Sequence, residues 1–255
     1  MPILNRDGAA LYYEVHGGEG PALLLTHGFM CTSEIWAPQI EVLSSHFKLI
    51  VWDLRGHGRT VAPDDPAQYS DDAVAADMAA LLDHVGAEAA IIGGHSLGGY
   101  LSLVFHLRYP ERVRALLIVA SGPGFRDDAA RAQWNARAIR KAERFEREGL
   151  REGEAEGYVH RTGAKGLALA ARGMVAQRDS SVLEHLPAIE VPSLIVVGVN
   201  DAPFQASAEY MRQKISGAEK VAIPGASHNV NCDQPRLFND AVLGFLGNTG
   251  LLPMV

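Results

Sequence analysis

Three residues of this chain have the types needed for nucleophilic catalysis: Ser96, Asp201 and His228. A serine hydroxyl becomes a useful nucleophile when a neutral imidazole accepts its proton and later delivers it to the leaving group. A carboxylate beside the imidazole fixes its tautomer and stabilises its charged form. The order serine, aspartate, histidine along the chain therefore predicts a nucleophile, an acid and a base for acyl transfer.

Ser96 is the centre of a Gly-x-Ser-x-Gly pentapeptide, residues 94–98, between an apolar run and a helix pattern. A strand that turns into a helix at this serine needs a strained backbone, and glycine at 94 and 98 removes side chains that would clash. The first turn of the helix then offers unpaired N–H groups to developing negative charge. An ordinary strand-to-helix turn also uses glycine and serine, so the pentapeptide alone leaves both interpretations open.

The surrounding pattern predicts an α/β fold with a mostly parallel sheet, an antiparallel N-terminal hairpin, and helices on both faces. Continuous apolar runs alternate with amphipathic segments, as expected for buried parallel strands joined by helices. The expected strands are residues 3–4, 11–15, 22–26, 49–52, 89–93, 113–119, 192–198 and 218–223, and the expected helices between them are 33–43, 71–85, 97–108, 204–215 and 235–246.

Working residues in such sheets collect at the carboxyl ends of the strands. Asp201 follows the strand that ends at Gly198, and His228 lies in the loop after the last strand. His27, His57 and His95 also belong to loops at this edge, where we expect them to support the site rather than to act as the base. The positions of the serine, the aspartate and the histidine at three strand ends favour catalysis over an ordinary turn.

An acyl-transfer site also needs two donors that converge on the developing oxyanion. One is expected to be the backbone N–H of Leu97, directly after the nucleophile. The second is expected to be the N–H of Phe29, in the loop after the strand 22–26, where His27-Gly28-Phe29 allows the chain to turn back toward Ser96.

After residue 120 the alternation stops for roughly seventy residues, far longer than an ordinary connection. Helices are expected at 127–148, 153–162 and 164–177. The pattern predicts a core of residues 1–120 and 186–255 with an inserted helical cap, residues 121–185. Four apolar cap residues could line the substrate pocket: Phe125, Trp134, Phe145 and Met174. Apolar residues at helical spacing also commonly pack a helix onto its core, so either role is open.

The composition limits the remaining classes of function. The chain has 255 residues, 47% hydrophobic and 21% charged, with a formal net charge of -7, which argues against a nucleic-acid surface. No signal pattern or membrane-length apolar run is present, so we expect a cytoplasmic protein without membrane partners. Two cysteines are too few for a disulfide framework or a paired zinc motif, and we expect buried thiols and no metal or cofactor.

Taken together, these segments resemble the α/β-hydrolase superfamily, in particular its capped serine esterase and lactonase branch. His27 to Phe29 resembles the oxyanion loop, residues 53–60 the segment after the next strand, residues 94–98 the nucleophile elbow, and residues 198–201 and 225–228 the acid and histidine loops. The resemblance implies a cofactor-independent hydrolase that cleaves a small-molecule ester or lactone through an acyl-enzyme. It also implies that Asp53 and Arg55 are structural.

The resemblance leaves some alternatives open and argues against others. Dehalogenases and epoxide hydrolases of this fold use aspartate at the elbow, whereas this chain has Ser96. Some relatives carry the acid after an earlier strand, where Asp127 and Asp128 are candidates, although Asp201 has the better local pattern. A carbon–carbon bond hydrolase, a thioesterase, a cofactor-free perhydrolase, or a ligand receptor of the same fold could use the same residues. The sequence does not indicate the oligomeric state.

Overall fold

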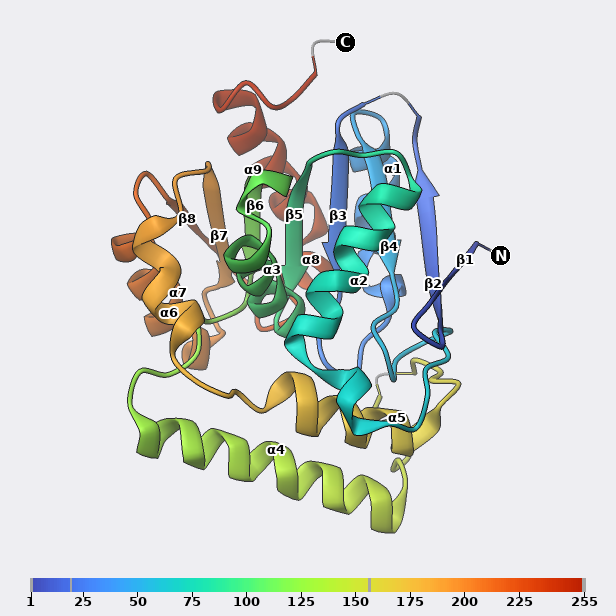
Figure 1. Ribbon diagram of the computed structural model, residues 1–255. Helices are drawn as coiled ribbons and strands as arrows, with labels where there is room; N and C mark the ends of the chain where they lie inside the picture. The colour runs from blue at the N-terminus through green and yellow to red at the C-terminus, as the bar shows by residue number, and fades with distance from the viewer. Residues whose placement is uncertain (1, 19, 156, 254–255) are drawn as a thin grey trace.

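The computed structural model describes residues 2–18, 20–155 and 157–253. Within them, an eight-stranded sheet has the order β1-β2-β4-β3-β5-β6-β7-β8 (Figure 1). The strands are β1 (Ile3–Arg6), β2 (Ala9–His16), β3 (Ala22–Thr26), β4 (Lys48–Trp52), β5 (Ala90–His95), β6 (Val113–Val119), β7 (Ser193–Gly198) and β8 (Glu219–Ile223). The pairs β1–β2 and β2–β4 are antiparallel and the others are parallel, which confirms the predicted fold class.

Helices cover both faces of the sheet because successive side chains of each strand point to opposite sides. Leu24 belongs to a buried cluster on one face that also contains residues of α2 (Asp71–His84), α3 (Leu97–Arg108) and α7 (Ala202–Lys214). Leu23 and Leu25 pack on the other face, with residues of α1 (Ala37–Ser44), α8 (Val230–Asp233) and α9 (Pro235–Asn248). Short 3₁₀ segments lie at η1 (Ser33–Trp36), η2 (Pro66–Tyr69), η3 (Pro110–Arg112) and η5 (Leu186–Ala188).

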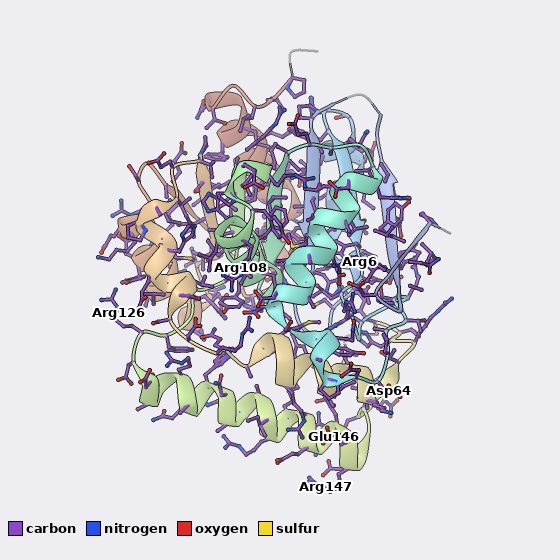
Figure 2. The ribbon with its side chains drawn as sticks, viewed as in Figure 1. Arg6, Asp64, Arg108, Arg126, Glu146 and Arg147 are labelled. Carbon is purple, nitrogen blue, oxygen red and sulfur yellow. The ribbon has the colours of Figure 1, made fainter. Side chains whose placement is uncertain are left out.

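Most of the segment between β6 and β7 forms a helical layer below the sheet edge (Figure 1). The layer contains α4 (Asp128–Glu148), α5 (Gly163–Ala170) and the π-helix η4 (Ala171–Val175), and the segment ends with α6 (Ser181–His185), which lies beside the sheet and contacts α3. In Figure 1, α5 lies between the sheet and α4, which is farthest from the strands. Figure 2 shows the labelled side chain of Arg147 at the outer margin of α4. The division of the chain at residues 121 and 185 stays a prediction.

Close backbone contacts join this layer to the core. A Cβ at Gly56 would stand 2.3 Å from the carbonyl oxygen of Gly166, and a Cβ at Gly173 would stand 2.2 Å from the carbonyl oxygen of Tyr69. The amide of Arg161 also donates to the carbonyl oxygen of Gly58 at 2.8 Å. Glycine is therefore required where the cap helices lie directly on the core loops.

The structure differs from the predicted elements mainly in the cap. The expected helix 153–162 is wrong, because the described part of this segment consists of turns and irregular chain, with Gly153 and Gly157 at positive φ; residue 156 lies outside the described residues. The predicted helix 33–43 begins as the 3₁₀ segment η1, and the predicted helix 164–177 ends in η4. Among the described residues, no helix combines the length and apolar character needed to cross a bilayer.

Candidate active site

Ser96 lies at the sharp turn between β5 and α3, with φ 52° and ψ −113°, an arrangement that L-residues rarely adopt. A Cβ at Gly94 would stand 2.2 Å from the carbonyl carbon of Gly98. A Cβ at Gly98 would stand 2.1 Å from the carbonyl oxygen of Thr26. Both glycines are thus needed for the strand and the helix to approach, and the turn holds the serine side chain at the end of the sheet.

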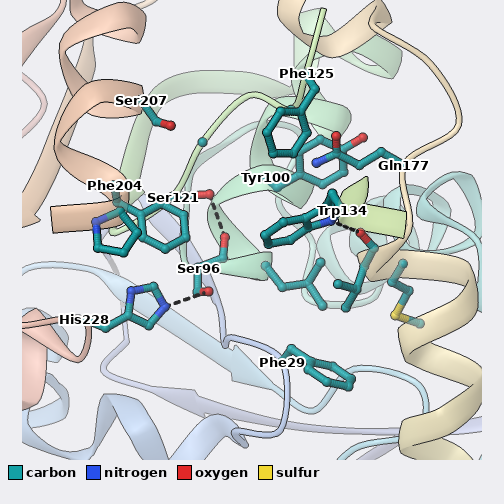
Figure 3. A pocket seen from close by; sticks show the side chains of 16 residues that line it. Phe29, Ser96, Tyr100, Ser121, Phe125, Trp134, Gln177, Phe204, Ser207 and His228 are labelled. Carbon is teal, nitrogen blue, oxygen red and sulfur yellow. Dashed lines mark hydrogen bonds between the residues drawn. The ribbon is translucent and has the colours of Figure 1, made fainter. Parts of the chain in front are cut away.

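The three predicted side chains form one chain of hydrogen bonds. Ser96 Oγ lies 2.9 Å from His228 Nε2, as the dashed line in Figure 3 shows, and His228 Nδ1 lies 2.8 Å from Asp201 Oδ2. A carboxylate can only accept, so the hydrogen of the neutral imidazole is on Nδ1, and Nε2 is left to accept the serine proton. Asp201 is buried, whereas 38% of the His228 side chain is exposed. Asp127, the alternative acid, instead caps α4 by accepting from the Ala130 amide.

Hydrogen bonds between two loops hold this geometry. The acid loop after β7 donates from Val199 to the carbonyl oxygen of Ile223 and from Asn200 to that of Ala226, both at 2.9 Å. Since Ile223 ends β8, these bonds tie the acid loop to the chain that leads into His228. Asp201 and His228, the candidate acid and base, are therefore positioned relative to each other by backbone contacts.

His95 holds the loop that carries His228 in place. Its Nε2 donates to the carbonyl oxygen of His228 at 2.9 Å, since a carbonyl can only accept. Burial, followed by the neighbouring imidazole of His228, lowers the pKa of His95 to about 3, so the side chain is neutral at physiological pH. His95 therefore holds the backbone of the candidate base rather than transferring protons itself.

A second buried histidine connects the loops after β3 and β4. His27 Nδ1 donates to the carbonyl oxygen of Gly28 at 2.7 Å, and its Nε2 accepts from the Leu54 amide at 3.0 Å. Burial lowers the pKa of His27 to about 4. A protonated ring would place two N–H groups against each other, so these loops require the neutral form. The ring of His57 packs between His27 and Phe29, with ring centroids 5.1 and 5.6 Å apart.

The segment after β4 serves as a scaffold. Arg55 is fully buried and binds Asp77 through Nε at 2.6 Å and through Nη2 at 2.8 Å. Asp53 accepts from the amides of Ser33 and Arg59 at 2.7 and 2.8 Å. These contacts hold loops in place. Neither Arg55 nor Asp53 lines the cavity at Ser96.

Two backbone donors are available for an oxyanion. Phe29 and Leu97, which were predicted for this role, both line the cavity beside Ser96. Leu97 begins α3, so its N–H has no partner within the helix. Across residues 2–18, 20–155 and 157–253, neither N–H donates to another protein atom. An anion beside Ser96 could therefore recruit both.

A cavity of about 450 Å³ opens in front of Ser96 and His228 (Figure 3). Phe125, Trp134 and Met174 line it, as anticipated. Phe145 does not: it is 1% exposed and packs with Met30, Ala142 and Leu167 between the cap and the oxyanion loop. Among the described residues, the lining contains no lysine, arginine, aspartate or glutamate. The cavity therefore suits an uncharged group.

Sequence reasoning missed several lining residues: Tyr100, Ser121, Gln177, Phe204 and Ser207. The ring of Phe204 lies 4.8 Å from that of His228 at 30°, so it packs against the candidate base. Ser121 donates to the carbonyl oxygen of Ser96 at 2.6 Å. For two of these residues the sequence does indicate a place near the site. Phe204 and Ser207 are three residues apart on the helix that follows Asp201, so they share one face of that helix.

The two cysteines lie outside the hydrogen-bonded chain that contains Ser96. Cys31 is buried as expected, but Cys232 of the short helix α8 is exposed, although its Sγ lies 3.3 Å from the carbonyl oxygen of Ile35. Within the described part of the chain, no group of three or more histidine, cysteine, aspartate or glutamate side chains is arranged to hold a metal ion.

Comparisons with known proteins agree with this architecture. Residues 21–149 match the sequence model of the family described as alpha/beta hydrolase fold. The chain is 30% identical to "Putative carbamate hydrolase RutD" of Azorhizobium caulinodans, over 97% of this chain and 98% of that protein. It is 26% identical to 3-oxoadipate enol-lactonase 1 of Acinetobacter baylyi, over 96% of each.

A solved structure is similar over nearly the whole chain. A thermophilic esterase from Thermogutta terrifontis has a TM-score of 0.83 and 28% identity, with 96% of each chain covered. Proteins named as hydrolases thus recur among sequence relatives and structures, which supports a hydrolase. The chain belongs to the α/β-hydrolase fold family.

Proposed function

We propose that this protein is a serine hydrolase that cleaves uncharged carboxylic esters or lactones through an acyl-enzyme. The observation that carries the proposal is the hydrogen-bonded chain from Ser96 through His228 to Asp201, at one end of a largely apolar cavity. The carbamate hydrolase, the enol-lactonase and the esterase among the similar proteins support acyl chemistry on this fold.

The geometry allows a complete catalytic cycle. Ser96 Oγ attacks the substrate carbonyl carbon while its proton passes to His228 Nε2, and the carbonyl oxygen becomes an oxyanion that the N–H groups of Phe29 and Leu97 can bind. When the tetrahedral intermediate collapses, the ester C–O bond breaks and the imidazolium protonates the leaving alkoxide. Asp201 stabilises the charged imidazole during both steps.

Water completes the reaction by the same steps. His228 accepts a proton from water, whose oxygen attacks the acyl carbon, and Ser96 leaves with the proton returned from the imidazolium. The products are a carboxylic acid and an alcohol. For a lactone, the alcohol oxygen belongs to the acyl chain itself, so no separate alcohol is released and the product is one hydroxy acid.

The cavity indicates the chemical class of the acyl group. Phe125, Trp134 and Met174 supply apolar surface, and the described lining contains no lysine, arginine, aspartate or glutamate. Burial of an isolated carboxylate there would be strongly unfavourable. We therefore expect uncharged acyl groups to react faster than their carboxylated analogues.

The test compares wild type with Ser96→Ala on a panel of activated esters and lactones, with β-diketones and acyl-thioesters included. Multiple turnovers of esters or lactones that fall at least about 10³-fold in Ser96→Ala are expected. The exposed Ser45→Ala is the matched control and should behave as wild type. Equal turnover by Ser96→Ala would overturn the proposal. Preferential cleavage of a diketone or thioester would change the substrate class, and one burst followed by a persistent adduct would indicate a receptor.

A further inference from the structure

Gln177 is a neutral polar side chain in the cavity wall, away from the reacting atoms. Figure 3 shows it on the opposite side of the cavity from His228, beyond Trp134. The remainder of that end is formed largely by aromatic rings, including Phe125 and Tyr100. A single carboxamide in such surroundings can have a large effect on which ligands fit.

The backbone of Gln177 is held from both sides by one residue of α4. Asn135 Oδ1 accepts from the Gln177 amide at 2.8 Å, and Asn135 Nδ2 donates to the Gln177 carbonyl oxygen at 2.7 Å. The preceding residue of α4, Trp134, donates from Nε1 to the carbonyl oxygen of Val175 at 2.8 Å. These three bonds fix residues 175–177 although the regular helix has already ended at Val175. The side chain therefore starts from an ordered position.

Among the residues that the structure describes, the carboxamide itself has no hydrogen-bond partner. Gln177 Oε1 is buried without a hydrogen bond, and its Nε2 donates to no other described residue. Gly124, at φ +93°, leaves the room that the carboxamide occupies, since a Cβ there would stand 2.7 Å from Oε1. Oε1 is therefore already shielded and unsatisfied, and an apolar ligand that filled the cavity would leave it so and also shield Nε2, which is costly.

We propose that Gln177 selects substrates that carry an uncharged hydrogen-bond donor, such as a hydroxyl or a primary amide, at the end remote from the scissile carbonyl. The assignment deepens the proposed hydrolase function and rests on it for the ester group. Because neither carboxamide atom has a partner among the described residues, a half-turn about the last side-chain bond can present Oε1 to a donor on the substrate, and an acceptor on the same group would pair with Nε2. An anion is disfavoured because the described lining contains no lysine or arginine.

The test uses pairs of aryl esters that differ in one group. The acyl chain ends either in a primary carboxamide or in a methyl ketone of nearly the same shape, and chain length is varied. Wild type is expected to favour the best-fitting carboxamide ester by about tenfold in kcat/KM. Gln177→Met, which keeps length and removes both polar atoms, should reduce the ratio to about one while simple alkanoyl esters are still cleaved.

Two further variants separate Gln177 from its surroundings. Gly124→Ala leaves the glutamine in the sequence but displaces its carboxamide, so it should also lower the preference. Tyr100→Phe, which removes another cavity hydroxyl, should keep it. A preference that survives in Gln177→Met, or that disappears only in Tyr100→Phe, would overturn the assignment to Gln177.

Binding to Ser96→Ala separates this inference from the proposed function. Dissociation constants for the same ester pairs are measured by titration, without turnover. About tenfold tighter binding of the carboxamide ester, lost in Ser96→Ala/Gln177→Met, supports the inference even if wild type cleaves no ester. Equal binding of both esters overturns it and leaves ester hydrolysis by Ser96 unaffected.

Discussion

The sheet edge and the cap enclose the same cavity, but different contacts hold them. At the sheet edge, the backbones of neighbouring segments lie in direct contact at glycines such as Gly94 and Gly98. Buried neutral histidines there form hydrogen bonds from one loop to the next. The cap segment, residues 121–185, carries 12 lysines and arginines against 10 acidic residues. In α4 only Ala138, Ala142 and Phe145 are buried.

This difference suggests separate roles for the two regions, with the sheet edge responsible for the reaction and the cap for the choice of substrate. A Cβ at Gly94 would meet backbone atoms at 2.2 Å, and a clash with backbone cannot be relieved by a rotamer change, so the elbow tolerates almost no variation. Most of α4 faces solvent, where a substitution has a small effect. The core therefore fixes how an acyl group would be attacked, while the cap can vary in which acyl group it admits.

The largest expected effect is at the elbow. Gly94→Val would place a branched side chain against the backbone of Gly98 and should lower the free energy of unfolding by about 3 kcal/mol or more. Turnover by the folded fraction should fall at least about 100-fold, because Ser96 moves. Denaturant unfolding and ester kinetics measure both. Gly244→Ala, in α9 with open space around it, is the control and should be neutral or stabilising. A Gly94→Val enzyme with full activity would show that the elbow is not rigid.

The next effect concerns packing of the cap. Phe145→Ala removes a fully buried ring and should cost about 3 to 5 kcal/mol of folding stability. Since Phe145 lies outside the cavity lining, kcat/KM for a short-chain ester should change less than about threefold in the folded enzyme. A shifted acyl-chain preference without loss of stability would instead place the ring in the pocket.

Acid should weaken the core through its buried histidines. The folded-state pKa values of His27 and His95, about 4 and about 3, lie below the unfolded value, so below pH 6.5 the unfolded state binds more protons. His27 and His95 together should therefore lower the free energy of unfolding by about 3 kcal/mol from pH 6.5 to pH 5, measured by denaturant titration. His57 and His106, whose pKa values burial also lowers, should add to this fall. His95→Gln should reduce the fall by about 1.5 kcal/mol. A pH-independent stability over this range would mean that these rings are solvated.

The smallest effect is expected on the cap surface. Arg172 pairs with Glu146 of α4 at 2.8 Å, with both side chains more than a third exposed. Arg172→Ala should change the free energy of unfolding by less than about 1 kcal/mol, and less still at high salt. A loss above about 2 kcal/mol, seen in the same denaturant assay, would show that charge contributes to the cap as strongly as packing does to the core.

The sequence predicted the sheet and the positions of its functional loops because their signals are local. Apolar runs marked the strands, and strand ends placed Asp201 and His228 at the edge that also carries Ser96. The hydrogen bond from His95 to the backbone of His228 could not be foreseen, since it joins residues 133 positions apart.

The cap was less predictable for physical reasons. Helical spacing identifies an apolar face but not what that face meets, so Phe145 and Trp134 looked alike although only Trp134 lines the cavity. Gly153 and Gly157 adopt positive φ, which turns the chain where a helix was expected. The position of Gln177 depends on Asn135 and on the π-helical turn before it, and neither has a recognisable sequence pattern.

The central claim is that Ser96 is the nucleophile, and covalent labelling tests it most directly. The folded protein is treated with an aryl phosphonate ester, the added mass is measured on the intact chain, and the modified residue is located by peptide sequencing. The account predicts one adduct per chain, on Ser96, with about 10³-fold slower labelling in His228→Ala. No adduct, or an adduct on another side chain with Ser96 unmodified, would contradict it.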